Sequence, residues 1–434
     1  MKYEANGWAL APLVLFLVIF IGTGFSLTMN GTSMAFYQLS ATVAILPAIA
    51  WAVWMGKGKI KDKINIFLSG AGESGIITMC MIYLLAGGFA SVAKAIGGVE
   101  STVNLGLSII PASMVLPGLF IIAAFIATAM GTSMGTIAAI APIAVGVAGK
   151  TDITSALLMG AVVGGAMFGD NLSMISDTTI AATRTQGCEM GDKFKMNFMI
   201  AIPAAVMTIV ILYMLGEGGQ VLQQGTYSLL KVLPYIIILV MAVVGINVFI
   251  VLGAGIVFTG IVGLFAVADF SVLKFSQDIY SGFTGMQEIL VLSLMIGGLG
   301  ELIKYHGGIT YIISFIGKLT RGTKSTRAGE FSISALSVLS DLCTANNTVA
   351  IILTGGMAKE IAKSHNVDPR RSASLLDIFS CVIQGVIPYG AQILLAGSIS
   401  QISPLEIIGN MYYCYILAFV AIISIITGFP RMKK

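Results

Sequence analysis

Two aspartates, Asp170 and Asp177, stand in an apolar stretch of the chain together with many oxygen-bearing side chains. The surrounding sequence, residues 167–184, reads MFGDNLSMISDTTIAATR. Placing an aspartate at the centre of a bilayer costs roughly 2.5–3.5 kcal/mol, so an acid in a membrane segment indicates an ion or proton site. We therefore expect Asp170 and Asp177 to bind Na⁺, with further ligands from neighbouring polar residues: Asn171, Ser173, Ser176 and Thr178.

The composition of the 434 residues determines the class of protein in which these acids lie. Hydrophobic residues make up 57% of the chain and charged residues 10%, whereas a soluble domain has about 25% charged residues. This predicts an all-α polytopic membrane protein with about ten transmembrane spans in one domain, residues 1–434. The five cysteines have no C-x-x-C spacing and indicate neither a disulfide framework nor a metal site. The composition also excludes a nucleic-acid-binding role.

Hydropathy separates regular spans from irregular ones. Two regions, 112–149 and 330–358, each contain two apolar runs that are too short to cross a bilayer and that flank a polar centre. They predict re-entrant hairpins. Two others, 154–184 and 373–400, are long enough to cross but are interrupted midway, which predicts discontinuous helices. The regular spans are expected near 8–28, 34–55, 74–94, 195–216, 230–246, 249–268, 285–303 and 406–428.

The order of these parts indicates an internal duplication. One predicted span contains Gly87-Gly88 and ends at Gly97-Gly98. A second span, 210 residues later, has the same spacing, with Gly297-Gly298 inside it and Gly307-Gly308 at its end. Each copy continues with a short arm, a hairpin, a broken span and a closing span. An odd number of crossings between the copies would make them inverted repeats. The predicted parts are the N-terminal two spans 1–70, repeat 1 at 71–216, linking spans 217–284 and repeat 2 at 285–430.

The basic residues predict the orientation. With both termini in the cytoplasm, all of the 24 Lys and Arg fall on the cytoplasmic side except Lys94, Lys150, Lys231 and Lys274, as the positive-inside rule requires. The two hairpins then enter from opposite faces, and their tips converge. This would bring polar residues of both repeats to the acids: Ser133 and Thr136 from the first hairpin, and Asp341, Asn346, Asn347, Thr348 and Gln392 from repeat 2.

Inverted repeats with broken helices at membrane depth are typical of secondary transporters, because unwound backbone is tolerated only where it lines a cavity or is buried in protein. An intramembrane hydrolase is the first alternative, since residues 131–135 match G-x-S-x-G. That motif lacks a base, because the two histidines, His306 and His365, are predicted on the cytoplasmic side. A channel is the second alternative, and paired broken helices favour alternating access over a continuous pore.

The residues Phe168-Gly169-Asp170, Ser173 and Ser176-Asp177-Thr178-Thr179 resemble the signature of the NhaC-type sodium/proton antiporters. The layout also resembles the wider ion-transporter superfamily. The resemblance implies elevator-like alternating access, a homodimer, and Na⁺ and H⁺ as coupling ions without another cofactor. It also implies an integral protein of the bacterial cytoplasmic (inner) membrane.

Two functions remain open for a carrier of this kind. The first is Na⁺/H⁺ antiport, in which the same carboxylates bind Na⁺ or protons in turn. The second is Na⁺- or H⁺-coupled transport of an amino acid or a small organic acid. In that case residues 345–347 and 388–392 would hold the solute, since the second break is polar but uncharged.

Overall fold

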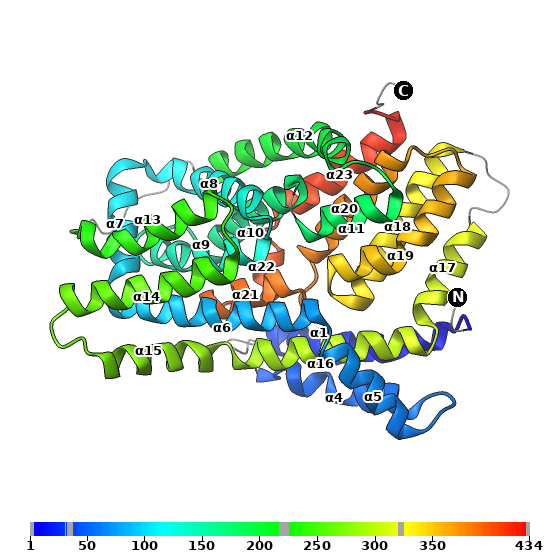
Figure 1. The fold of residues 1–434 in the computed structure, drawn as a ribbon, viewed down its shortest axis with the longest axis horizontal. Helices are drawn as coiled ribbons and strands as arrows, with labels where there is room; N and C mark the ends of the chain where they lie inside the picture. The colour runs from blue at the N-terminus through cyan, green and yellow to red at the C-terminus, as the bar shows by residue number, and fades with distance from the viewer. Residues whose placement is uncertain are drawn as a thin grey trace. The chain divides into compact units, whose positions relative to one another are not determined.

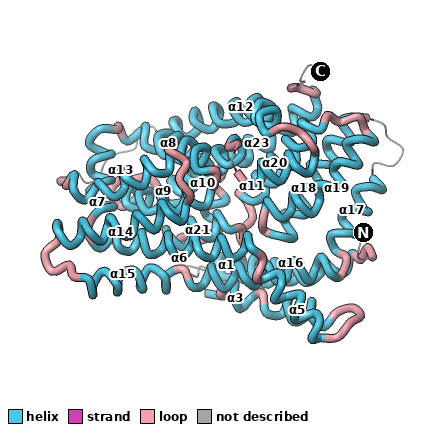
Figure 2. Tube along the Cα trace, viewed as in Figure 1, coloured by secondary structure: helices cyan, strands magenta, loops and turns pink. Residues whose placement is uncertain are grey.

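The computed structural model describes residues 4–30, 32, 38–174, 176–216, 225–319 and 325–430. Within these ranges the chain forms helices joined by turns and loops, with no strand (Figure 2). The predicted all-α fold is therefore confirmed. The start of the second expected span, residues 34–37, and the basic C-terminal residues 431–434 lie outside the described residues.

The described chain divides into two compact units, each assembled from both halves of the sequence. Unit 1 contains residues 1–80, 181–189 and 288–384, and unit 2 contains residues 81–180, 190–287 and 385–434. This division differs from the predicted repeats, because each unit takes segments from both of them. Helices α6 and α11 carry the chain from one unit to the other.

Unit 1 contains the N-terminal helices and the whole of the second half's hairpin (Figure 1). Its helices are η1 (Gly7–Leu10), α1 (Ala11–Met29), α3 (Ala41–Ala44), α4 (Leu46–Trp54), α5 (Ile60–Ala71), the start of α6 (Ser74–Ala95), the end of α11 (Asp177–Gln186), α16 (Gln287–Tyr305), α17 (Gly308–Leu319), α18 (Thr326–Thr344), α19 (Asn347–Ser364) and α20 (Pro369–Gln384).

Unit 2 contains the rest of α6 and α11 and the helices that build the first hairpin. These helices are α7 (Gly98–Ile109), η2 (Ala112–Met114), α8 (Val115–Met130), α9 (Ser133–Ala148), α10 (Ser155–Leu172), α12 (Met190–Gly216), α13 (Leu229–Val243), α14 (Val248–Ala266), α15 (Val272–Gly285), α21 (Ala391–Ser400), α22 (Pro404–Ile408) and α23 (Tyr412–Thr427). Helices α8, α9 and α10 pack together at its centre (Figure 1).

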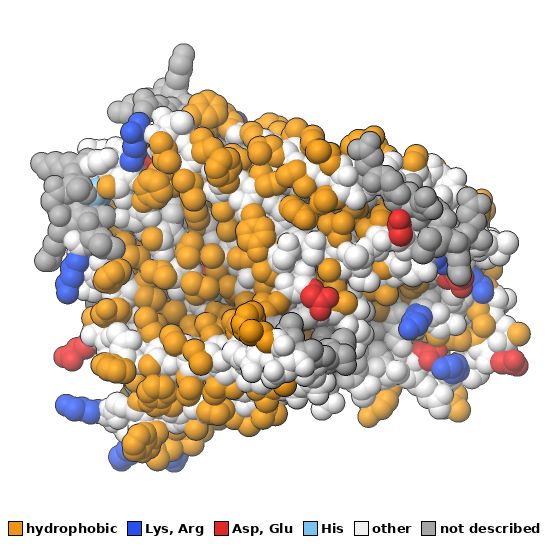
Figure 3. All heavy atoms as spheres, turned by 180° about the vertical axis from the view of Figure 1, so that it is seen from behind, with side chains coloured by type: hydrophobic (Ala, Val, Ile, Leu, Met, Phe, Trp, Pro, Cys, Tyr) orange, Lys and Arg blue, Asp and Glu red, His pale blue; other side chains and the backbone are white. Residues whose placement is uncertain are grey.

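Several of these helices suit a bilayer. Five helical stretches of the described chain are long and apolar enough to cross it: Gly7–Leu27, Ser74–Ala95, Ser155–Gln186, Met190–Gly216 and Val248–Ala266. The pair Val272–Gly285 and Gln287–Tyr305, bent by 41°, could add a sixth. Hydrophobic side chains cover much of the face in Figure 3, with few charged ones among them. These features fit a polytopic membrane protein, while the prediction of about ten spans stays a prediction.

The two halves share an order of helices and of helix ends. Gly97 and Gly307 have φ of 74° and 88°, a left-handed conformation that glycine adopts without strain. A 12-residue helix follows each of them, α7 and α17. At the two hairpin tips, Gly131 and Ala345 are also left-handed, and each is followed by a residue whose side chain caps the next helix. The inverted orientation of the copies remains a prediction.

Both predicted interruptions are present. The first falls between the end of α10 at Leu172 and the start of α11 at Asp177, and the second between the end of α20 at Gln384 and the start of α21 at Ala391. Helices α8 and α9 have 16 residues each, about 24 Å at a rise of 1.5 Å per residue. Each is therefore shorter than the bilayer core of roughly 30 Å.

Candidate functional site

Asp170 lies in a buried cluster of hydroxyl groups in unit 2. Its side chain is 7% exposed. The Ser133 hydroxyl donates to Asp170 Oδ2 at 2.8 Å, and the Ser176 hydroxyl donates to Asp170 Oδ1 at 2.6 Å. Thr178 Oγ1 lies 2.8 Å from Ser176 Oγ. A carboxylate that accepts charge-assisted hydrogen bonds on both oxygens can remain ionised at a depth where an isolated charge would be costly.

Two glycines bring α10 close enough to the first hairpin to place Asp170 there. A Cβ on Gly165 would lie 2.2 Å from the carbonyl oxygen of Phe120, and one on Gly169 would lie 2.3 Å from that of Ala124. Both are backbone atoms that no side-chain movement can relieve, so α8 and α10 touch backbone to backbone, as small residues permit in membrane proteins. Asp170 directly follows Gly169. The close contact between α8 and α10 at Gly169 therefore sets the position of Asp170 relative to the first hairpin.

The tip of the first hairpin presents a helix N-terminus to the carboxylate. Gly131 ends α8 with φ of 71°, and the Thr132 hydroxyl then accepts from Gly135 N at 3.4 Å as the cap of α9. Ser133 is the first residue of α9. The positive end of a helix dipole favours a neighbouring anion, so the start of α9 suits an acidic side chain such as that of Asp170.

The second interruption contributes Gln392 to the same cluster. Its Nε2 donates to Ser133 Oγ at 3.0 Å, and its side chain is 4% exposed. Gln392 belongs to the first turn of α21, directly after the break that follows α20. The structure therefore brings together four of the predicted ligands: Asp170, Ser133 and Ser176 from the first half of the chain and Gln392 from the second.

The broken helix is held by a buried lysine that sequence reasoning missed. Lys193 is 1% exposed, and its Nζ donates to the Asn171 carbonyl oxygen at 2.8 Å and to Thr179 Oγ1 at 2.7 Å. Asn197 Nδ2 donates to the same carbonyl at 3.0 Å. These bonds connect the end of α10 to α11 across the break. In the sequence Lys193 belongs to a cluster of basic residues, and that pattern placed it with the cytoplasmic surface charges.

The other predicted ligands of repeat 1 have different surroundings. Asn171 is buried, and its Oδ1 accepts from Asn197 Nδ2 at 3.2 Å. The Thr136 hydroxyl donates to the Thr132 carbonyl of its own helix, and Ser173 uses its carbonyl to accept from Thr179 Oγ1. Asp177 is exposed at the first residue of α11. The buried carboxylate of this stretch is therefore that of Asp170. The apolar sequence around the two acids had predicted both Asp170 and Asp177 as buried ligands, and for Asp177 the structure corrects this prediction.

The tip of the second hairpin lies in unit 1 and is also polar. Asn346 caps α19, with its Oδ1 accepting from Val349 N at 3.1 Å, and Asn347 Oδ1 accepts from Thr348 N at 3.0 Å. Thr348 is half-buried. Asp341, one turn before the tip, is completely buried, and its carboxylate lies near the backbone N–H of Asn346.

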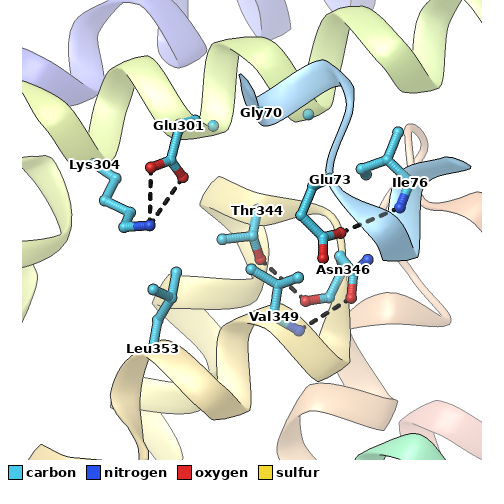
Figure 4. A pocket seen from close by; sticks show the side chains of 11 residues that line it. Gly70, Glu73, Ile76, Glu301, Lys304, Thr344, Asn346, Val349 and Leu353 are labelled. Atoms are coloured by element: carbon cyan, nitrogen blue, oxygen red, sulfur yellow. Dashed lines mark hydrogen bonds and ion pairs between the residues drawn. The ribbon is translucent and has the colours of Figure 1, made fainter. Parts of the chain in front are cut away.

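A small cavity of about 40 Å³ lies beside this tip (Figure 4). Two acids line it. Glu73 caps the start of α6, accepting from Gly75 N at 2.8 Å, and Glu301 pairs with Lys304 at 2.9 Å. Thr344 and Asn346 also line it, and Asn346 lies beside Glu73 (Figure 4). This volume suits one or two water molecules or an ion rather than an amino acid.

A helical membrane protein with interrupted helices and a buried carboxylate among hydroxyl groups has the features of a secondary transporter. The comparisons with known proteins specify the class. The model of the Na⁺/H⁺ antiporter family matches residues 4–217. Over 96% of this chain and 95% of the relative, the sequence is 25% identical to the malate-2H⁺/Na⁺-lactate antiporter of Bacillus subtilis.

Two further relatives cover most of the chain. The Na⁺/H⁺ antiporter NhaC of Bacillus subtilis is 25% identical over 83% of this chain and 84% of its own length. The arginine/ornithine antiporter ArcD of Halobacterium salinarum is 24% identical over 100% of this chain and 93% of its own length. The chain belongs to the NhaC-type Na⁺/H⁺ antiporter family, as the resemblance predicted, and it is a secondary antiporter of the membrane.

Proposed function

We propose that this protein exchanges Na⁺ for H⁺, and that the two ions compete for Asp170. The observation that carries the proposal is the buried carboxylate with a serine hydroxyl on each oxygen, Ser133 at 2.8 Å and Ser176 at 2.6 Å. A carboxylate in such a place can be neutralised by a proton or by a cation. Only one of them can occupy the same oxygens, so binding of one ion releases the other.

The hydroxyl groups can serve both states. Each serine has one O–H donor and two acceptor lone pairs, and its hydrogen rotates to suit its surroundings. When Asp170 is ionised without a cation, the hydroxyls donate to it. When Na⁺ is bound, the hydroxyls of Ser133 and Ser176 turn their lone pairs toward the cation and join Asp170 as oxygen ligands. Gln392 keeps Ser133 in place through its Nε2–H donation.

The proposal includes elevator-like alternating access. Such a mechanism needs a body that carries the site as a whole, and the four side chains of the Asp170 cluster all belong to unit 2. A moving body that contains them would carry the ion without dismantling its ligands. A homodimer in the bacterial inner membrane, with both termini cytoplasmic, completes the proposed arrangement.

A second candidate is antiport coupled to an organic solute. The observation in its favour is that two relatives that cover nearly the whole chain are named for malate and lactate and for arginine and ornithine. Under this candidate Asp341, Asn346, Asn347 and Thr348 would contribute to a solute or second ion site. The Asp170 cluster would keep its role as the site of the coupling ion.

Proteoliposomes with an internal pH dye test both candidates. Na⁺/H⁺ antiport predicts that an imposed Na⁺ gradient changes the internal pH in buffer without amino or organic acids. The solute-coupled candidate predicts such a change only when the right solute is added, and a panel of radiolabelled acids run in parallel would identify it. Asp170→Asn should abolish the signal under both candidates. Asp269→Asn, the same substitution at an exposed left-handed turn, should leave it unchanged.

A further inference from the structure

Unit 2 contains a second cavity whose chemistry differs from that of the ion site. It has a volume of about 160 Å³ and lies among α7, α8, α9 and α13. Aliphatic side chains form its walls, among them Val103, Leu119, Ile140 and Leu239. Thr102 is the one hydroxyl-bearing residue in the lining, and its hydroxyl donates to the Gly98 carbonyl at 2.8 Å. The described walls therefore offer no free polar side chain.

This cavity is unsuitable for water. A buried water needs two to four polar partners, whereas an apolar cavity of about 150 Å³ stays dry and takes up apolar molecules. An empty cavity of this size is destabilising, because its walls lose both van der Waals contacts and burial. The occupant that fits these walls is a flexible hydrocarbon.

The cavity can be reached from the surface of unit 2. Ile122, in its lining, is 39% exposed, and the neighbouring Ile121 and Phe125 on the same helix are 49% and 62% exposed. Gly106 and Gly118 are half-buried in the lining, and a Cβ on either would meet no atom within 4 Å. Exposed apolar side chains on a membrane protein face lipid tails, so an acyl chain is the hydrocarbon available at this entrance.

Positive charge stands at one end of the cavity. Lys231 Nζ lies 3.6 Å from the position of a Cβ on Gly97, immediately before α7 begins. Thr102, the first lining residue of α7, follows Gly98 by four residues, about 6 Å along a helix. Lys94 is three residues before Gly97, and neither lysine forms an ion pair within the described chain. Glu100, the nearby acid, is already paired with Lys150 at 3.0 Å.

We propose that this cavity binds one acyl chain of an anionic phospholipid, whose headgroup phosphate is held by Lys94 and Lys231. The aliphatic walls take the hydrocarbon, and the two lysines lie near the start of α7, before its first lining residue, Thr102. Basic residues beside pockets between membrane helices can bind the headgroups of anionic lipids. This lipid site is separate from the Asp170 cluster and does not depend on the proposed exchange.

Native mass spectrometry of the purified full-length chain tests the site. Delipidated protein is titrated with dioleoyl phosphatidylglycerol and, separately, with dioleoyl phosphatidylcholine. We expect one tightly retained phosphatidylglycerol per chain. Gly118→Leu places a side chain into the cavity and should lower that occupancy at least fivefold. Gly253→Leu is the matched control, since its Cβ also meets nothing within 4 Å but its helix, α14, does not line the cavity.

Charge variants separate the headgroup from the chain. Lys94→Gln with Lys231→Gln should remove the preference for phosphatidylglycerol over phosphatidylcholine while both lipids still bind. Gly106→Leu and the smaller Gly118→Ala provide independent cavity variants if Gly118→Leu does not fold, and both should lower occupancy relative to Gly253→Leu. Equal occupancy in the cavity variants and the control would overturn the proposal. So would a wild-type chain that retains detergent but no phospholipid.

Discussion

Gln392 donates a hydrogen bond to Ser133 at 3.0 Å, and Ser133 in turn donates to Asp170 at 2.8 Å. Gln392 and Ser133, 259 positions apart in the sequence, thus contact each other beside the Asp170 carboxylate. Each comes from a place where a helix is interrupted, the first hairpin tip for Ser133 and the second break for Gln392. The Asp170 cluster of unit 2 is therefore built from both halves of the chain.

Removing a hydroxyl from this cluster should weaken Na⁺ binding without unfolding the protein. Ser176→Ala deletes a hydrogen bond to a charged group, which is worth about 1.5–3 kcal/mol, together with one oxygen ligand. We expect the KM for Na⁺ in proteoliposomes to rise about tenfold or more, because 1.4 kcal/mol is a factor of ten. Ser276→Ala, on the exposed face of α15, should keep the wild-type KM. An unchanged KM in Ser176→Ala would remove Ser176 from the proposed ion site.

Lys193 should act by positioning the two parts of the broken helix. Lys193→Met keeps the aliphatic length but removes the donor to the Asn171 carbonyl and to Thr179. We expect a loss of about 1–3 kcal/mol in stability and a raised KM for Na⁺ with a smaller change in kcat. Lys195→Met is the control, since the Lys195 side chain is 64% exposed, and surface changes usually stay within about 0.5 kcal/mol. A stability loss with an unchanged KM would make Lys193 purely structural.

Much of this site could be predicted from the sequence, because intramembrane acids and hydroxyls are rare enough to be conspicuous. Asp170, Ser133 and Ser176 followed from that argument, and so did both helix interruptions. The exposure of Asp177 could not be predicted in this way. Whether its side chain faces the cluster depends on the exact residue at which α11 begins. Lys193 was missed because a lysine among other basic residues has the pattern of a surface charge, and only the folded chain shows which carbonyls it reaches. Hydropathy placed spans at 230–246 and 406–428, where the described chain forms helices of 15 and 16 residues, because hydropathy marks an apolar segment but not the residue at which its helix ends.

Topology can be tested with single cysteines at exposed positions. The inverted arrangement predicts that Asp152→Cys, after the first hairpin, reacts with an impermeant thiol reagent from outside. It predicts that Lys363→Cys, at the end of α19, reacts only from the cytoplasm. Both residues are exposed in the structure. Labelling of both from one face would contradict the inverted repeats.

His306 should make stability depend on pH outside the membrane-spanning segments. Burial lowers the pKa of His306 below its ordinary 6.5, and its Nε2 lies 2.8 Å from the Ala52 carbonyl. The folded chain thus binds this proton less readily than the unfolded chain. Its contribution to stability is present above about pH 6.5 and decreases as the pH falls from there toward the folded pKa. Thermal unfolding from pH 8 to 5 should show this decrease in wild type and less of it in His306→Gln, which can still donate to Ala52. Equal pH dependence in both proteins would exclude His306 as its source.

The competition of Na⁺ and H⁺ for Asp170 is tested most directly by counting the protons that Na⁺ displaces. The purified chain is titrated with NaCl at fixed pH by calorimetry in two buffers of different ionisation enthalpy, which separates proton release from binding heat. Since one carboxylate takes either ion, the wild type and Asp269→Asn should release up to about one proton per Na⁺ bound, most at low pH. Asp170→Asn should neither bind Na⁺ tightly nor release a proton. Na⁺ binding without proton release at any pH, or wild-type release by Asp170→Asn, would contradict the account.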